Sequence, residues 1–142
     1  MRNDRATYED QRSIAAWLLA WGIGSMSAGA ALMRKRGPWR DIGLQWMIWG
    51  AIDALLAVFG VRGAQQKLQN LDSLPAGQAE RDTRNLQRIF AINAVLDIGY
   101  LAAGGWLFRS RRFHGHGAGV LVQALFLLIF DVLHAVRLSR RG

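Results

Sequence analysis

The feature that most constrains this chain is the apolar stretch 120–137, because it carries an acidic side chain, Asp131. The stretch is long enough to cross the hydrocarbon core of a bilayer, which takes about 20 helical residues. An ionised carboxylate in hydrocarbon costs about 2.5–3.5 kcal/mol on insertion scales, so such a group is kept where it faces protein, water or a ligand. Two further apolar stretches contain Asp53 and Asp97. The sequence therefore predicts a membrane protein with an interior polar site.

The apolar segments predict an all-α, integral membrane four-helix bundle that forms a single membrane domain over residues 1–142. The expected membrane helices are residues 13–33, 42–61, 89–108 and 119–138. A secretory signal peptide is the competing interpretation of the first segment, but the length of its apolar run and its neutral flank favour a membrane helix. Residues 62–88 are polar, with a helical spacing broken near Pro75, so we expect a polar helical hairpin there. Residues 113–119, with His114, His116 and three glycines, are expected to form a solvated turn.

The two halves of the chain are similar when one is shifted by 78 positions. The aligned pairs are Arg34 with Arg112, Gly37 with Gly115, Gln45 with Gln123 and Asp53 with Asp131. The expected architecture is therefore two tandem helical hairpins related by a pseudo-two-fold along the membrane normal, the parallel kind of repeat. We call the face that holds both termini and the 62–88 segment side A, and the face that holds the two short basic turns side B.

The aspartates of the three apolar stretches are expected to lie at one depth. Each is six to nine residues from the basic residue that ends its stretch on side A, which is roughly 9–14 Å at ~1.5 Å per residue. The predicted ligand- or proton-binding cluster consists of Asp53, Asn93, Asp97, Tyr100, Asp131 and His134. Gln45 and Gln123 would be secondary polar residues about two turns nearer side B. Trp21 and Trp49 would line the site with aromatic rings that a lipophilic cation can face.

Three carboxyl groups in one low-dielectric layer cannot all be ionised cheaply. We therefore expect the cluster to hold and exchange a proton, with Asp97 and Asp131 as the principal carboxylates and His134 as a proton partner. The leading hypothesis is a proton-coupled carrier or binder of a small or lipophilic cation. An alternative is a structural or accessory subunit of a larger membrane complex, whose polar layer fixes helix packing and whose first helix meets the partner through its small residues. A cofactor-binding bundle is the weaker alternative.

Other chemistries find less support in the sequence. The chain has no cysteine, which excludes disulfides and thiolate sites. Ser25 and Ser27 have no evident base, so no catalytic residue is predicted and the protein is expected not to be an enzyme. His134 lacks a second axial ligand at a matching depth for haem, so neither a metal nor a cofactor is predicted. The basic residues follow directly on apolar runs, where they meet lipid headgroups. The expected partners are the lipid bilayer and a homo-oligomer or larger membrane complex, and not nucleic acid.

Long polar segments usually stay in the cytoplasm. We therefore expect a multi-pass protein of the cell inner (plasma) membrane, with the termini and the 62–88 segment cytoplasmic. The numbers of Lys and Arg near the helix ends are almost equal on the two sides, so a dual topology stays open. In size and helix number the chain resembles the small multidrug-resistance exporters, which bind lipophilic cations at a glutamate in their first helix. The resemblance extends to architecture alone, because the acidic residues here lie in the other three helices.

Overall fold

Four long α-helices make up most of the computed structural model, which describes residues 2–139 and, within them, the side chains of residues 4–139. They are α1 Arg2–Met33, α2 Pro38–Gln69, α3 Gln78–Arg109 and α4 His114–Ser139, and the 3-10 turn η1 Leu71–Ser73 follows α2. The described residues contain no strand. The predicted all-α, four-helix class is therefore confirmed. All four helices are long and apolar enough to cross a membrane, as expected of a membrane protein.

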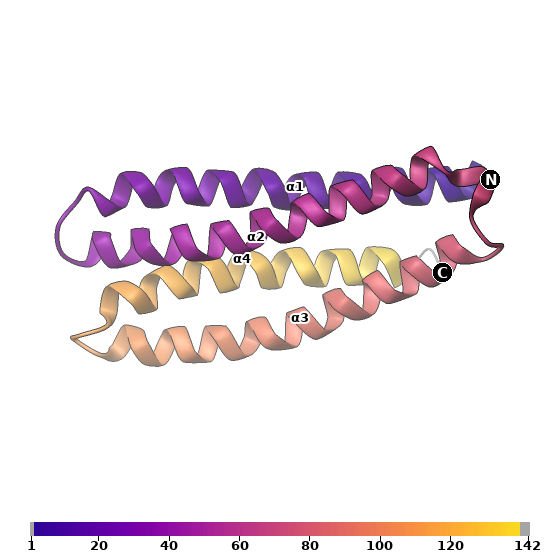
Figure 1. Cartoon of the computed structure of the whole chain (residues 1–142). Coiled ribbons are helices and arrows are strands. Elements are labelled where there is room, and N and C mark those ends of the chain that lie inside the picture. Colours follow the sequence, from indigo (N-terminus) through magenta and orange to yellow (C-terminus); the bar gives the residue numbers. More distant parts are fainter. Residues whose placement is uncertain (1, 140–142) are drawn as a thin grey trace.

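The helices form two hairpins, α1 with α2 and α3 with α4 (Figure 1). The turns within the hairpins lie at one end of the molecule, which is side B. The start of α1, the α2–α3 connection and the end of α4 lie at the other end, side A. The hairpins pack on each other mainly through α2 and α4, which run in parallel, whereas α1 and α3 touch little.

All four helices begin before the expected membrane segments, and the starts of α1 and α4 fall where no helix was expected. α1 starts in the polar N-terminal segment instead of at residue 13, and α4 starts at His114 instead of residue 119. The glycines of 113–119 are packing residues. A Cβ on Gly115 would lie 2.6 Å from the carbonyl oxygen of Pro38, and one on Gly117 would lie 2.6 Å from the Cα of Phe108. Side chains of any size would keep the start of α4 away from α2 and α3, so a glycine-rich run that resembles a turn is a closely packed helix.

The backbones of α1 and α2 are in direct contact through glycine. A Cβ on Gly22 would lie 2.7 Å from the carbonyl oxygen of Gly50, and a Cβ on Gly29 would lie 2.7 Å from that of Gly43. Such small residues let helices approach closely in a membrane. Much of the small-residue face of α1, which the accessory-subunit hypothesis assigned to a partner, is therefore occupied within the chain itself.

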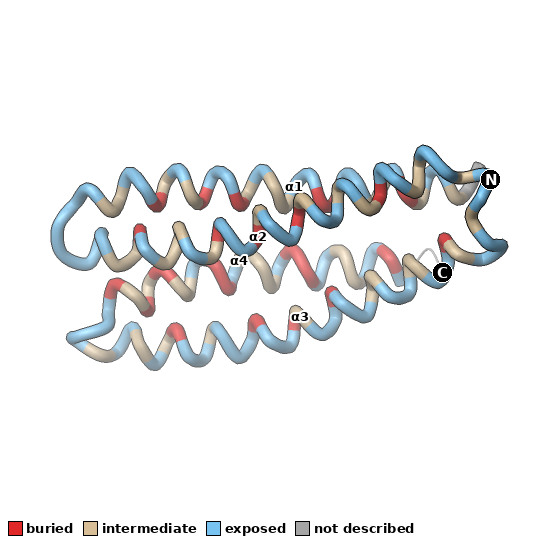
Figure 2. The backbone as a smooth tube through the Cα atoms, viewed as in Figure 1, coloured by how far each residue is buried: buried red, intermediate tan, exposed pale blue. Residues whose placement is uncertain are grey.

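Buried positions follow the inner sides of the helices, and the outer sides are exposed (Figure 2). A hydrophobic core of Ile14, Phe90, Phe130 and Leu138 fills the bundle toward side A. Many large apolar side chains point outward, among them Trp17 and Val95, which are 71% and 69% exposed. An apolar exterior of this kind fits contact with lipid.

Candidate functional site

Three buried aspartates lie on three different helices. Asp53 on α2, Asp97 on α3 and Asp131 on α4 are 4%, 3% and 5% exposed. Each belongs to the buried stripe of its helix, where inward positions recur at intervals of three, four or seven residues, as in Asp53, Ala57 and Ala64. Such spacing keeps side chains on one helix face. The same periodicity that forms the core therefore also places the acidic groups inside the bundle.

The carboxyl groups of these aspartates lie close enough to interact. Those of Asp97 and Asp131 are within hydrogen-bonding reach, and Asp53 is close enough to interact electrostatically with both. A hydrogen bond between two carboxyl groups requires a proton on one of them. The Oδ2 atoms of Asp53 and Asp97 are buried and have no hydrogen-bond partner among the described residues. Burying such atoms is costly, so the arrangement is suited to holding a proton or another positive charge.

The two predicted neighbours on α3 are less deeply buried than these aspartates. Asn93 is half-buried one turn before Asp97. Tyr100 is 39% exposed, so its predicted place in the buried cluster is wrong. Its ring packs edge-on against Trp49, with 4.9 Å between ring centroids. The inward position one turn after Asp97 is taken by Leu101, which leaves Tyr100 at the edge of the buried stripe.

His134 is placed against aromatic rings and its own helix. Its Nδ1 lies 2.7 Å from the carbonyl oxygen of Phe130, and its ring packs near the rings of Phe90 and Phe130. Arg137, the other basic neighbour of Asp131 in sequence, donates to Asp10 at 2.5 Å. Asp131 therefore interacts with Asp97. His134 instead packs among the aromatic rings, between the carboxyl groups and side A.

The polar residue Gln123 links α4 to α1 at a level nearer side B. It is 1% exposed; its Oε1 accepts a hydrogen bond from Trp21 Nε1 at 3.0 Å, and its Nε2 donates to Ser25 Oγ at 3.1 Å. The Trp21 ring also stacks on Phe126 at 3.5 Å between centroids. One face of the Trp21 ring is thereby covered. Ser25 was missed as a partner, although it lies one helical turn from Trp21 on the same face.

Gln45 makes a second link between the hairpins, close to side B. Its Nε2 lies 3.2 Å from Nδ1 of His116, and Nε2 of His116 lies 3.5 Å from Oδ1 of Asp41. Nδ1 of His114 lies 2.8 Å from the carbonyl oxygen of Phe108. The expected turn is wrong, because both histidines are on α4 and have protein partners, but His114 is exposed, as expected, and His116 is half-buried.

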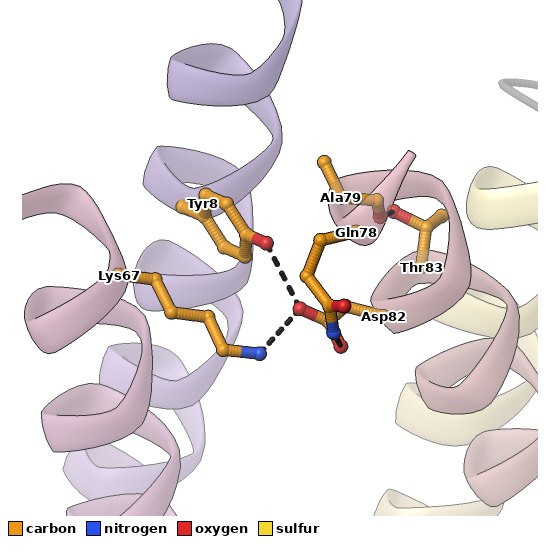
Figure 3. Close-up of polar contacts among 6 residues, drawn as sticks. All are labelled: Tyr8, Lys67, Gln78, Ala79, Asp82 and Thr83. Atoms are coloured by element: carbon orange, nitrogen blue, oxygen red, sulfur yellow. Dashed lines mark hydrogen bonds and ion pairs between the residues drawn. The ribbon is translucent and has the colours of Figure 1, made fainter. Parts of the chain in front are cut away.

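A further polar cluster, at side A, was not predicted (Figure 3). Tyr8 of α1 is fully buried and its hydroxyl donates to Oδ2 of Asp82 of α3 at 2.9 Å. The Nζ of Lys67 of α2 donates to the same oxygen and forms an ion pair with it, and Nε2 of Gln78 donates to Oδ1 of Asp82 at 3.0 Å. The cluster joins the two hairpins where the helices extend past their apolar segments. A tyrosine in a charged stretch was the available signal, but the sequence alone does not show that it is buried or what it contacts.

Two further observations concern metal binding and the position of a cavity. No three His, Asp or Glu side chains within the described residues are arranged to hold a metal ion. A cavity of about 650 Å³ opens at side A between α1, α3 and α4, with Thr7, Thr83 and Leu138 in its lining. That cavity is separate from the three aspartates.

Comparison with known proteins identifies the family of the chain. No curated protein and no solved structure matches the chain. The family of unknown function DUF6992 matches residues 17–132, a range that contains Asp53, Asp97 and Asp131 and most of the length of the four helices. The chain therefore belongs to the DUF6992 family.

Proposed function

We propose that the protein is a proton-coupled carrier or binder of a small or lipophilic cation, with the Asp97–Asp131 pair as its proton-exchanging site. The observation that supports this proposal is the meeting of three buried carboxyl groups from three helices, with two oxygens that have no hydrogen-bond partner among the described residues. In this proposal the protein lies in the plasma membrane with side A in the cytoplasm.

The exchange conserves charge at the site. Without a cation, a proton is shared between Asp97 and Asp131, and their hydrogen bond offsets part of the cost of burying them. When a cation approaches, the O–H bond of the protonated carboxyl group breaks and the proton leaves to water. The pair then carries two negative charges instead of one, and the bound cation offsets the added charge. Asp53 adds a further acidic group that interacts with both aspartates.

Conservative substitutions of the pair test the proposal. In detergent, tetraphenylphosphonium should bind the wild-type protein more tightly as the pH rises, and a pH-sensitive dye in weak buffer should report release of about one proton per cation. Asp97→Asn and Asp131→Asn should each abolish proton release and the pH dependence of binding. The Asn amide can donate to the remaining carboxylate, so both variants should stay folded. Asp72→Asn, at an exposed residue of η1, is the matched control and should behave as wild type.

A purely structural role gives a different result. In that case, Asp97→Asn and Asp131→Asn change thermal stability, while the wild-type protein binds the probe without releasing a proton or does not bind it. Either of these observations contradicts the carrier proposal. They would favour the accessory-subunit alternative, in which the carboxyl layer fixes helix packing.

A further inference from the structure

The two short turns at side B form one strongly basic surface. The first turn and the start of α2 contribute four basic side chains, and the end of α3 with the following turn contributes three. We call the whole set the side B basic surface: Arg34, Lys35, Arg36, Arg40, Arg109, Arg111 and Arg112. All seven are exposed. Residues that are some 70 positions apart in sequence are thereby gathered at one end of the molecule (Figure 1).

Close helix packing fixes the two turns beside each other. A Cβ on Gly115, just after the second turn, would lie 2.6 Å from the carbonyl oxygen of Pro38, just after the first. The contact between His116 and Gln45 also joins α4 to α2 at this level. The basic side chains of both hairpins therefore share one surface, even though the hairpins are separated along the chain.

The charge of this surface is hardly compensated within the protein. Asp41 is the one acidic residue near the two turns in the sequence, and it lies 3.5 Å from His116. Side A also has more basic than acidic residues, eleven against six, but there the acidic residues are interspersed with the basic ones. Lys67, Arg84 and Arg137 there each lie within ion-pair distance of an aspartate or glutamate. An anionic partner is therefore favoured at side B.

Aromatic rings on the same surface indicate which anionic partner fits. Trp39, Trp106 and Phe113 are 55%, 75% and 39% exposed. Lys35 lies over the ring of Trp39 at 5.6 Å, and Arg112 lies over that of Phe113 at 5.3 Å. Exposed aromatic rings are typical of the headgroup level of a membrane, and Lys and Arg clusters next to membrane helices attract acidic lipids. A surface with both features fits a phospholipid headgroup better than a free ion.

We propose that the side B basic surface binds anionic phospholipids and enriches them around this end of the protein. The inference is independent of the carboxyl site, because it rests on other residues at another depth. The proposed ligand is the phosphate group of a lipid, and phosphatidylglycerol is the probe. Because exposed charges are screened by salt, the preference for the acidic lipid should weaken as ionic strength rises.

Reconstitution into vesicles with brominated lipids measures this preference. Quenching of tryptophan fluorescence by brominated phosphatidylglycerol is compared with quenching by brominated phosphatidylcholine. The test variant combines Arg34→Gln, Lys35→Gln and Arg36→Gln. The matched control combines Arg81→Gln, Arg84→Gln and Arg88→Gln, which removes the same charge from side A. A second test variant, Arg111→Gln with Arg112→Gln, serves if the first triple variant does not fold.

The wild-type protein should prefer phosphatidylglycerol by about tenfold or more, and the side B variants should lose most of this preference. The side A variant should keep it. The proposal would be overturned if the two lipids quenched the wild-type protein equally. It would also be overturned if the side A and side B variants lost the preference for phosphatidylglycerol to the same extent. Displacement of the lipid by inorganic phosphate at constant ionic strength would also overturn it, since the surface would then be a site for free anions.

Discussion

Tyr8 illustrates how a single side chain can join the two hairpins. It comes from a charged segment, yet it is fully buried, and its hydroxyl donates to a carboxylate that Lys67 and Gln78 also contact. Hydrogen bonds to charged groups contribute more than neutral ones, about 1.5–3 kcal/mol. The Tyr8 hydroxyl should therefore contribute to stability far from the carboxyl layer.

Replacing Tyr8 by Phe tests this contribution. Because Lys67 and Gln78 remain as partners of Asp82, we expect Tyr8→Phe to lower the free energy of unfolding by about 1.5 kcal/mol, the low end of that range. Equilibrium unfolding in detergent micelles with increasing sodium dodecyl sulfate measures the change. Tyr100→Phe is the control, since Tyr100 is partly exposed and packs through its ring, and it should change stability by about 0.5 kcal/mol or less. Equal effects of both substitutions would contradict the role given to the Tyr8 hydroxyl.

The sequence predicts buried residues best where exposure would be most costly. The burial of Asp53, Asp97 and Asp131 follows from the cost of a carboxylate facing lipid. Tyr100 and His134 can satisfy their polar atoms at an edge or on their own helix, so helical spacing from an aspartate is not enough to place them. Which rings cover one another, such as Trp21 and Phe126, depends on the rotation of the helices. Hydrophobic periodicity determines that rotation only approximately.

At the scale of helices, packing by glycine decides how closely the elements approach. The sequence contains the positions of the glycines, but it does not show which face of each helix they use. In α1, a Cβ on Gly22 would lie 2.7 Å from the carbonyl oxygen of Gly50, whereas a Cβ on Gly24 would meet no neighbouring atom within 4 Å. The expected turn over 113–119 was wrong for the same reason. Glycine marks either a break in a helix or a close contact, and composition does not separate the two.

These two glycines give a matched pair of substitutions. We expect Gly22→Ala to lower the free energy of unfolding by about 1–3 kcal/mol, because the new methyl group must push α1 away from Gly50 and Ala54. Gly24→Ala should be neutral or raise it by up to ~1 kcal/mol, because alanine favours the helix. The same unfolding titration in mixed micelles measures both. Similar stabilities for the two variants would show that the tight α1–α2 contact is not formed.

At the scale of the whole molecule, the number of helices determines which segments lie on the same side. An even number of crossings brings the chain ends together, and the long polar connection between the second and third helices joins them at side A (Figure 1). The sequence predicts this arrangement without any side-chain detail. It does not determine which compartment side A faces, because basic residues occur at both ends. The shift of 78 positions between the halves also remains a prediction.

Orientation can be measured with single cysteines, because the natural chain has none. Ser73→Cys places a thiol at side A, and Ser110→Cys places one at side B. If side A is cytoplasmic, a membrane-impermeant maleimide should label Ser110→Cys in intact cells and label Ser73→Cys only after permeabilisation. Ser139→Cys, also at side A, should follow Ser73→Cys. The reverse pattern would place the side B basic surface in the cytoplasm, and equal labelling of Ser73→Cys and Ser110→Cys in intact cells would establish a dual topology.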